Sequence, residues 1–301
     1  MKHKTAIKTL EELAEEAKSA QARREQQQLQ RANERGTQQF DLVSVLNSHA
    51  LMRYPVFSTR YGSQQQQEEP ILYYSSDGSV SVEVKGSYGI PNQADANIIR
   101  WAISVARQVR TETGVVPEEI STTRYKLLKD LGKTVTGTNY RNLEQSLKVL
   151  GGINISGNIF DKNQEFTGTL MEFNYTRDGS GKIDKIVMIF NKNFRQHLQR
   201  DESVLTIPGE VLVSNNPLQI RLIEVARCHM GKKPKWEVRL TKLMSLCYEK
   251  RRSKYEFKRA VKKTNLPYSV EFRKSADNKD EVVVFQSSVE IKSLDSAKNQ
   301  T

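Results

Sequence analysis

The chain has 301 residues, 37% of them hydrophobic, and a formal net charge of +12 at pH 7. This length predicts roughly two domains with small cores. No apolar run approaches the ~20 residues of a membrane span. Two cysteines, Cys228 and Cys247, exclude a disulfide framework and are expected to be buried thiols. The start, Met1-Lys2-His3-Lys4, leads into a charged helix rather than an apolar signal core, so we expect a cytoplasmic protein with no membrane partner.

Residues 1–38 are expected to form a helical, low-complexity arm. A helix over 4–35 fades into Gln26-Gln27-Gln28 and ends at Gly36. Its apolar stripe covers only about three turns, too short for a coiled coil, so the segment is expected to fray or to bind a partner. The stripe consists of Ile7, Leu10, Leu13, Ala14 and Ala17.

Residues 39–85 are expected to form a strand-containing extension. A polar break at Gln64-Gln65-Gln66-Gln67 interrupts it. After the break, the apolar run 71–74, the pair Asp77-Gly78 and the alternating residues 80–84 predict a hairpin.

A first domain is expected over residues 86–205, where the pattern becomes regular. Pro91 and Asp95, a candidate N-cap, precede a helix whose apolar face is wide enough to place it at the centre of a core. The apolar residues of this helix are Ile98, Ile99, Ala102, Ile103, Val105, Ala106 and Val109.

A helix-turn-helix pattern follows in the same domain. A short helix over 122–131 is stopped by Gly132, residues 133–137 form a turn, and a second helix runs over 138–150. The second helix directs inward Tyr140, Leu143, Leu147 and Leu150.

Three β runs come next, over 153–160, 166–175 and 183–190. Residues 177–181, Arg-Asp-Gly-Ser-Gly, predict a hairpin between the last two runs. Helix, helix, turn, helix and hairpin is the order of a winged helix.

The same order recurs over residues 206–290, which are expected to form a second domain. Asn216 caps a helix with Pro217 at its first position. A strand over 236–238 leads to a second helix that begins near Thr241. Ser253-Lys254-Tyr255-Glu256 is a capping box that opens a third helix.

A final hairpin completes the repeat: alternating residues from Tyr268 to Phe272, a turn at Asp277-Asn278 and a return over 282–285. We therefore predict an α+β fold with tandem winged-helix domains, an N-terminal helical, Gln-rich extension and a disordered tail over 291–301.

The net charge is concentrated in the second domain. Residues 216–274 contain 17 Lys and Arg against 5 Glu, a charge of +12, while the remaining 30 basic and 30 acidic residues cancel. Charge placed in this way attracts a polyanion and binds it by releasing counterions, so we expect a nucleic acid partner. The alternative is a basic, well-solvated face, but these charges alternate with apolar residues at helical spacing.

In a helix-turn-helix, the second helix faces base edges with its N-terminal residues. In the first domain these residues are of the types that form paired hydrogen bonds to guanine or adenine. In the second domain the corresponding residues are mostly basic, so we expect them to contact DNA phosphates as well as bases. The candidate DNA-binding residues are Thr138, Asn139, Arg141, Asn142, Gln145, Arg251, Arg252, Lys254, Lys258, Arg259, Lys262 and Lys263, with Arg273 and Lys274 near the tip of the second wing. For each of them, an ordinary place on a helix surface is the competing interpretation.

Enzyme motifs fail on inspection. Gly132-Lys133-Thr134 imitates the end of a phosphate-binding loop, but Leu127 stands where the earlier glycine is required. The four histidines are scattered without metal-binding spacing, and Cys228-His229 with Cys247 supplies too few ligands for structural zinc. We therefore expect no catalytic residues, no metal, no cofactor and no enzymatic activity.

Two segments resemble the replication initiator protein A family of bacterial plasmids. Residues 88–95 fit its pattern Gly-x-Pro-x-x-x-Asp before the first helix, and residues 136–150 fit Gly-x-x-Tyr-x-x-Leu-x-x-x-Leu in the recognition region. The resemblance covers about residues 86–290, while the Gln-rich segment 1–85 departs from the family core.

This resemblance implies tandem winged helices that bind direct repeats (iterons) at a plasmid origin, open the adjacent duplex and recruit host replication proteins. It also implies a homodimer, since families of this type often repress their own promoter as dimers. The runner-up function is a transcriptional or partition regulator of the winged-helix type without initiator activity. Such a regulator would bind DNA with the same helices, but it would not need a second, strongly basic domain that binds the adjacent DNA.

Overall fold

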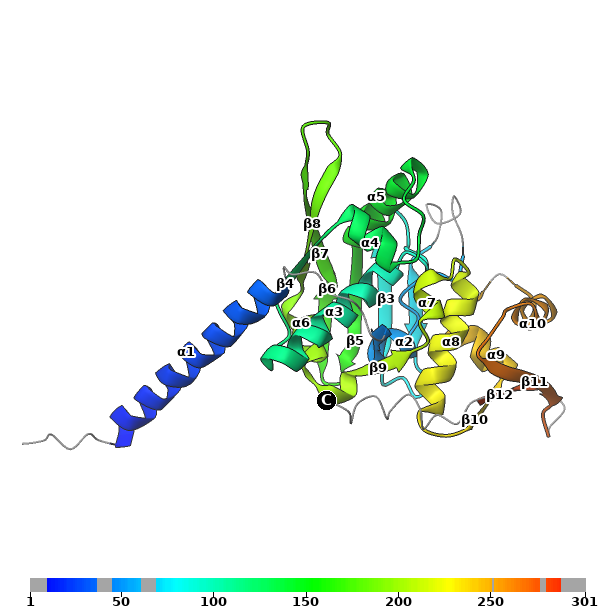
Figure 1. Cartoon of the computed structure of the whole chain (residues 1–301). Coiled ribbons are helices and arrows are strands. Elements are labelled where there is room, and N and C mark those ends of the chain that lie inside the picture. The colour runs from blue at the N-terminus through cyan, green and yellow to red at the C-terminus, as the bar shows by residue number, and fades with distance from the viewer. Residues whose placement is uncertain (1–9, 37–44, 61–68, 251, 277–279, 288–301) are drawn as a thin grey trace, which may run out of the picture.

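The computed structural model describes residues 10–36, 45–60, 69–250, 252–276 and 280–287. Within these residues the fold is mixed α/β, in agreement with the expected class, and all paired strands are antiparallel. Two lobes lie side by side with helix α8 (Pro217–Met230) between them, and helix α1 (Leu10–Gly36) projects from the larger lobe (Figure 1).

The larger lobe contains a first unit in which helices and strands alternate before a projecting hairpin. Its elements are α3 (Asn97–Thr113), β4 (Glu119–Thr123), α4 (Arg124–Asp130), α5 (Gly137–Gly151), β7 (Met171–Arg177) and β8 (Ile183–Phe190). The three strands form one sheet in the order β4-β8-β7. The expected helix over 122–131 is therefore shorter than predicted, because residues up to Thr123 pair with β8 instead.

The smaller lobe repeats this order after α8. Its elements are β10 (Lys235–Arg239), α9 (Leu240–Leu246), α10 (Lys254–Lys262), β11 (Tyr268–Lys274) and β12 (Glu281–Ser287). The sheet order is β10-β12-β11, so the first strand again pairs with the last and the hairpin supplies the outer strand. Asn216 caps α8, and the capping box of Ser253 and Glu256 opens α10, both as predicted.

A separate four-stranded sheet, in the order β2-β3-β5-β6, belongs to the larger lobe. Its strands are β2 (Ile71–Tyr74), β3 (Ser81–Gly86), β5 (Ile153–Asp161) and β6 (Gln164–Gly168). The predicted hairpin over 71–84 is confirmed as β2 and β3. The predicted single strand over 166–175 is wrong: the chain leaves the sheet at Gly168, whose φ is +152°, and continues into β7 of another sheet.

Helix α3 is the central helix of the larger core, as its wide apolar face predicted, and Ile99, Ile103 and Val109 on it are buried. The N-cap is Ala96, not Asp95. Asp95 is engaged elsewhere: its carboxylate accepts hydrogen bonds from the N–H of Asn92 (2.9 Å) and from the hydroxyl of Ser146 on α5 (2.6 Å). This aspartate therefore attaches α5 to the turn before α3.

The connection between the two units, from Phe194 to Asn215, contains regular structure. Its elements are part of α6 (Lys192–Gln199), a 3-10 turn (Asp201–Ser203), β9 (Val204–Ile207) and α7 (Glu210–Val213). Strand β9 pairs with β1 (Val45–Ser48), which is followed by α2 (His49–Arg53), so the segment before the first unit holds the connection in place.

Helix α8 belongs to both cores. Ile220 and Ile223 pack in the larger apolar cluster, whereas Leu222 and Val225 pack in the smaller one. Between them, Arg221 is completely buried, and its guanidinium donates to the carbonyl oxygens of Met52 on α2 (2.8 Å) and Leu246 on α9 (2.7 Å). The two units therefore share a helix and a buried polar joint rather than a flexible linker.

Both cysteines are free thiols on apolar faces, as predicted; Cys247 is buried and Cys228 is half-buried. Burial raises the pKa of Cys228 to about 11 and that of Cys247 to about 12. Both thiols therefore stay protonated at neutral pH.

The C-terminal end of α1 is attached to the larger lobe. Ala32 is buried, the Oδ1 of Asn33 accepts the N–H of Glu118 (2.7 Å), and Arg35 pairs with Glu112 (2.5 Å). Residues 17–28 of the same helix are all exposed, including Ala17 of the predicted stripe. Ile7 and the side chains of Leu10, Leu13 and Ala14 lie outside the described part of the chain.

Candidate nucleic-acid interface

The segment that consists of α4, the turn and α5 is attached to the core through helix α3. Asp130, the last residue of α4, accepts hydrogen bonds from the indole Nε1 of Trp101 on α3 (2.9 Å) and from the Nζ of Lys126 (2.7 Å). Gly132 ends the helix with φ +64°, and a Cβ at this position would lie 2.4 Å from a methyl group of Val213. The positive φ and the close approach of Val213 therefore both require glycine at the start of the turn.

Helix α5 presents a polar, exposed N-terminal face. The hydroxyl of Thr136 accepts the N–H of Asn139 and caps the helix. Four of the predicted contact residues point to solvent: Thr138, Arg141, Asn142 and Gln145. Leu143 and Leu147 on the opposite face are buried, as the helical spacing predicted.

Asn139 differs from the other predicted residues of α5. Its side-chain amide donates to the carbonyl oxygen of Thr134 (2.8 Å) and to the hydroxyl of the same residue (2.9 Å). Both amide hydrogens are thus used to hold the turn, which leaves the amide oxygen as the only group for an outside partner.

In the second unit, α10 exposes a basic face. Phe257 and Val261 are buried against the smaller core, whereas Arg259, Lys262 and Lys263 are exposed. Within the described residues, these three side chains form no ion pair, and the Nζ of Lys262 lies 5.5 Å from the ring centre of Phe272. A cationic surface of this kind binds phosphates with little dependence on sequence.

Two predicted residues of α10 are already paired with carboxylates. Lys258 is half-buried between Glu281 and the ring of Phe272, whose centre lies 5.1 Å from its Nζ. Lys254 forms an ion pair with Asp280 (3.4 Å). Both acidic residues border the second hairpin, so the two lysines attach α10 to it.

Of the remaining predicted residues of the second unit, some are paired with carboxylates and others are not. Arg252 pairs with the buried Glu249 (3.3 Å), and Arg273 pairs with Glu271 on the same strand (2.6 Å). Lys274 is exposed at the end of β11, and Arg251 lies outside the described residues. Both pairs are local in the sequence: Glu249 lies three residues before Arg252, and Glu271 lies two residues before Arg273 on the same strand. This spacing was an available signal that the sequence analysis did not use.

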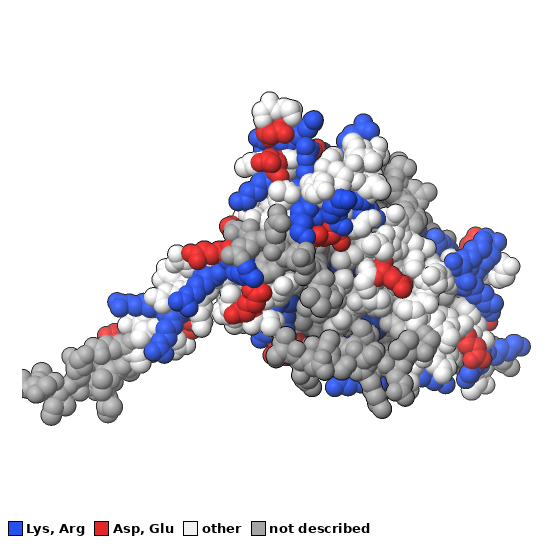
Figure 2. Space-filling view, in the orientation of Figure 1, with Lys and Arg blue, Asp and Glu red and all other residues white. Residues whose placement is uncertain are grey.

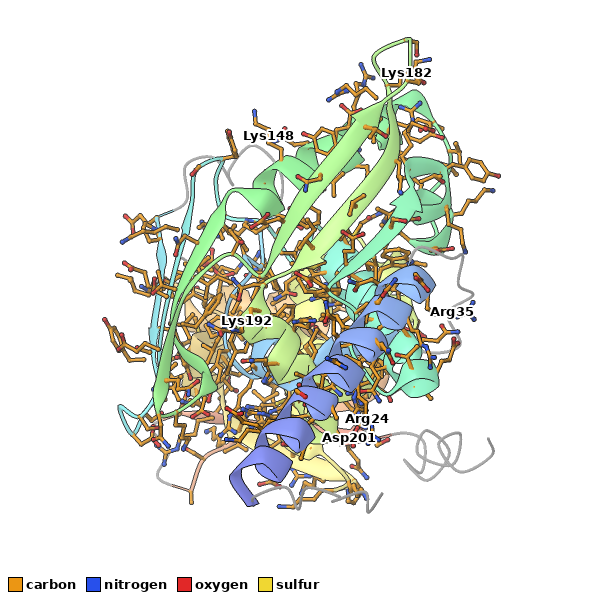
Figure 3. All side chains as sticks on the ribbon, turned by 90° about the vertical axis from the view of Figure 1, so that its left-hand side faces the viewer. Arg24, Arg35, Lys148, Lys182, Lys192 and Asp201 are labelled. Atoms are coloured by element: carbon orange, nitrogen blue, oxygen red, sulfur yellow. The ribbon has the colours of Figure 1, made fainter. Side chains whose placement is uncertain are left out.

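The hairpin of the first unit carries basic residues that the sequence analysis did not select. Lys182 and Lys185 are exposed beside its tip, and Arg177 donates to the carbonyl oxygen of Gly181 (2.7 Å). Lys182 and Lys148 of α5 lie at the same end of the first unit (Figure 3). The turn sequence at 177–181 predicted a hairpin, and the basic residues beside it could have indicated that this hairpin contacts DNA.

The distribution of charge over the surface follows these elements. Figure 2 shows Lys and Arg grouped on the end of the smaller lobe that carries α10, and on the upper edge of the larger lobe near the β7–β8 hairpin. Mostly uncharged surface, with an acidic group in it, lies between the two basic groups on this face (Figure 2).

The model of the family described as replication initiator protein A matches residues 46–269 of the chain. The chain belongs to this family. Membership gives it an initiator role in DNA replication, as the two segments of resemblance predicted.

The fold of the chain is similar to that of a solved structure of domains 2 and 3 of RctB. The TM-score is 0.59, with 15% identity over 81% of this chain and 99% of that one. A second structure of RctB domains 2–3 gives a TM-score of 0.49 and 12% identity over 73% of this chain and 91% of that one. No curated protein sequence matches the chain.

The described part of the initiator offers little other chemistry. It contains no group of three His, Cys, Asp or Glu that could hold a metal ion. None of its described helices has the length and apolar character needed to cross a bilayer. His197 is buried and His229 is half-buried, and this burial lowers the pKa of each to about 4, so both rings are neutral at physiological pH.

Proposed function

We propose that the chain is a sequence-specific, double-stranded DNA-binding plasmid replication initiator whose two units are winged helices. One observation carries this proposal: each unit has a helix, a strand, two helices and a hairpin in this order, with β5 and β6 inserted before the hairpin of the first unit, and the last helix of each unit turns an exposed polar or basic face outward. In a helix-turn-helix, that helix enters the major groove. Helices α5 and α10 are the proposed recognition helices.

The two helices have different tasks in this proposal. Arg141, Asn142 and Gln145 of α5 read base edges, since an Arg side chain pairs with guanine and an Asn or Gln side chain with adenine. Arg259, Lys262 and Lys263 of α10 bind mainly phosphate and supply most of the salt-dependent affinity.

The hairpins act beside the helices. Lys182 and Lys185 on the first hairpin, and Lys274 on the second, reach the backbone that flanks each major groove. Lys254 pairs with Asp280 and Lys258 pairs with Glu281, so these two lysines hold α10 against its hairpin rather than contacting duplex DNA directly.

The biological setting rests on family membership. The DNA is proposed to consist of direct repeats at a plasmid origin, and binding to promote opening of the neighbouring duplex. Host replication proteins and a second copy of the chain are the proposed protein partners, and the bacterial cytoplasm is the proposed location.

The test is binding of the full chain to duplex fragments from the DNA that flanks its gene, compared with scrambled fragments, by fluorescence anisotropy at several salt concentrations. We expect one fragment with direct repeats to bind more tightly than its scrambled version, and affinity to fall steeply as salt rises. Equal affinity for both versions would contradict sequence-specific binding.

A second measurement separates an initiator from the runner-up regulator. A plasmid that carries only this gene and the bound fragment should replicate in a host that lacks another origin for it. A regulator would instead bind an inverted repeat over a promoter and would leave such a plasmid unable to replicate.

A further inference from the structure

A groove lies where the larger lobe meets the smaller one, and neither recognition helix accounts for it. Its volume is about 500 Å³. One wall is the edge strand β2, with Leu72 and Tyr74, and the other is formed by α9 and the residues after it, with Met244 and Tyr248. Lys254, at the start of α10, also lines the groove.

The walls of the groove are apolar and aromatic, although they face solvent. Tyr74 is 69% exposed and Leu72 is 44% exposed. Tyr248 is the only non-glycine residue with positive φ (+52°) in the described part of the chain. Backbone strain of this kind persists where the surrounding structure holds it, and it is frequent at ligand sites.

The strained position directs the hydroxyl of Tyr248 to the edge of β2. This hydroxyl accepts the N–H of Leu72 (2.9 Å) and donates to the carbonyl oxygen of Pro70 (3.1 Å). An added peptide strand would need the same N–H group, so strand addition along β2 is blocked at Leu72. The aromatic walls therefore remain available for stacking rather than for strand pairing.

Three cationic side chains line the groove. Lys250, Arg252 and Lys254 all line it, and the Nζ of Lys250 lies 4.5 Å from the ring centre of Tyr248. The only acidic residue in the lining is Glu249, whose carboxylate is buried beside Arg60 (3.5 Å) and Arg252 (3.3 Å). The accessible charge of the groove is thus positive.

We propose that this groove binds a nucleotide. The base stacks on Tyr74 and against Met244 and Tyr248, and the phosphate lies at Lys250 and Arg252, while Lys254 stays paired with Asp280. Aromatic side chains beside a cationic surface are the combination that binds unstacked bases without sequence preference. The same chemistry is offered by a free mononucleotide and by an unpaired nucleotide of a DNA strand held at α10; the second source rests on the proposed function.

The test titrates the full chain with three probes: deoxyadenosine monophosphate, ATP, and single-stranded oligothymidine of about twelve nucleotides. We expect at least one probe to bind, and Tyr74→Ala to weaken that binding about tenfold, as loss of a stacked base does. Tyr74→Trp should retain the affinity. The matched control Tyr125→Ala removes a tyrosine that is 55% exposed on α4, outside the groove, and should change nothing.

The phosphate position has its own pair of variants. Lys250→Gln should weaken the same probe and reduce its salt dependence, whereas Lys192→Gln, at the start of α6 on the face seen in Figure 3, should do neither. If only the mononucleotides bind, the groove serves free nucleotides; if only the oligonucleotide binds, it serves an unpaired strand.

Three results would overturn the proposal: no probe binds, Tyr74→Ala and Tyr125→Ala weaken binding equally, or an oligoglutamate peptide competes as well as the nucleotide. Duplex affinity is measured alongside, and Tyr74→Ala should leave it unchanged. A wild-type chain that binds no duplex but still binds a mononucleotide through Tyr74 would refute the proposed function and leave this inference standing.

Discussion

Arg100 on α3 and Glu224 on α8 form an ion pair of 2.6 Å across the junction of the two units, with only 1% and 0% of their side chains exposed. The guanidinium also donates to the carbonyl oxygen of Gln93 (2.7 Å) and to the Oδ1 of Asn97 (2.8 Å). The amide of Asn97 in turn donates to the carbonyl oxygen of Leu212 on α7, the short helix that precedes α8 (3.0 Å). The polar joint therefore fixes the relative positions of the helices that we propose to bind DNA.

Arg100→Met should destabilise the chain strongly. Removing Arg100 takes away the nearest cation of the buried Glu224 carboxylate, which then keeps only the more distant guanidinium of Arg221 (3.8 Å) and the amide of Asn47. Loss of one partner of a buried pair costs ~3–5 kcal/mol. Urea unfolding measures the change, and Arg100→Met with Glu224→Met together should recover much of it. Arg110→Met is the matched control, because its partner Asp201 is exposed and such pairs contribute ~0–1 kcal/mol. Similar losses for both single variants would contradict a structural role for the buried pair.

Stability should fall as the solution is acidified below the ordinary pKa of histidine. Burial lowers the pKa of His197 from 6.5 to about 4, so between these values the unfolded chain binds a proton that the folded chain does not. The unfolded state is therefore favoured as pH drops, by roughly 2–3 kcal/mol at about pH 4.5 from this residue. His229, also lowered to about 4, acts in the same direction.

The check is the free energy of unfolding at neutral pH and near pH 4.5, for the wild type and for His197→Gln. The variant should lose part of the difference, because it removes the proton that binds only to the unfolded chain. An unchanged pH dependence would show that His197 is already protonated in the folded state or exposed to water. Ser48, whose hydroxyl lies 3.1 Å from the Nε2 of His197, should remain a hydrogen-bond partner for the glutamine.

Substitutions in the two recognition helices should have different signatures. Arg141→Ala and Asn142→Ala should relax discrimination between specific and scrambled DNA by ~1–3 kcal/mol each. Lys262→Ala and Lys263→Ala should weaken binding to both DNAs and reduce the salt slope by about 0.9 for each phosphate that is no longer neutralised. Lys258→Ala is the internal control, since its pairing with Glu281 predicts a loss of stability rather than of salt slope. Equal losses on both DNAs for Arg141→Ala would refute its role in base recognition.

The arm should be dispensable for DNA binding but not for replication. Deletion of residues 1–27 keeps the buried Ala32 and the contacts of Asn33 and Arg35, so the fold and the affinity should be unchanged. A truncation that begins at Phe40 also removes these contacts and should lower stability as well. Both are assayed for origin affinity and plasmid maintenance. Full maintenance after deletion of 1–27 would show that the arm recruits nothing essential.

The order of elements was predictable because local signals were strong. Gly132, the spacing of Leu143 and Leu147, and the capping box at Ser253 each determine a boundary by short-range geometry. Strand β4 was missed because only Ile120 among its residues is apolar, and its pairing with β8 is a long-range contact. The break at Gly168 was missed for a similar reason, since the flanking residues continue the β pattern while the chain changes sheets.

The sequence predicted which residues of the candidate site are exposed, but not which of its charged residues form long-range ion pairs. Exposure of Arg141, Asn142 and Lys262 follows from helical periodicity alone. The partners of Lys258 and Lys254, and the junction through Arg100 and Glu224, depend on tertiary structure that brings distant segments together. Periodicity assigns a charged residue to a helix face, but it does not show which opposite charge the fold places beside it.

Hydroxyl-radical footprinting of the full chain on its origin DNA tests the central claim most directly. If α5 and α10 bind one duplex from a rigid pair of units, two protected patches should appear on one face, about one helical turn or ~34 Å apart. Arg141→Ala should weaken one patch, and Lys262→Ala with Lys263→Ala should weaken the other. A single patch shorter than one turn, or two patches that respond equally to both sets of variants, would contradict the account.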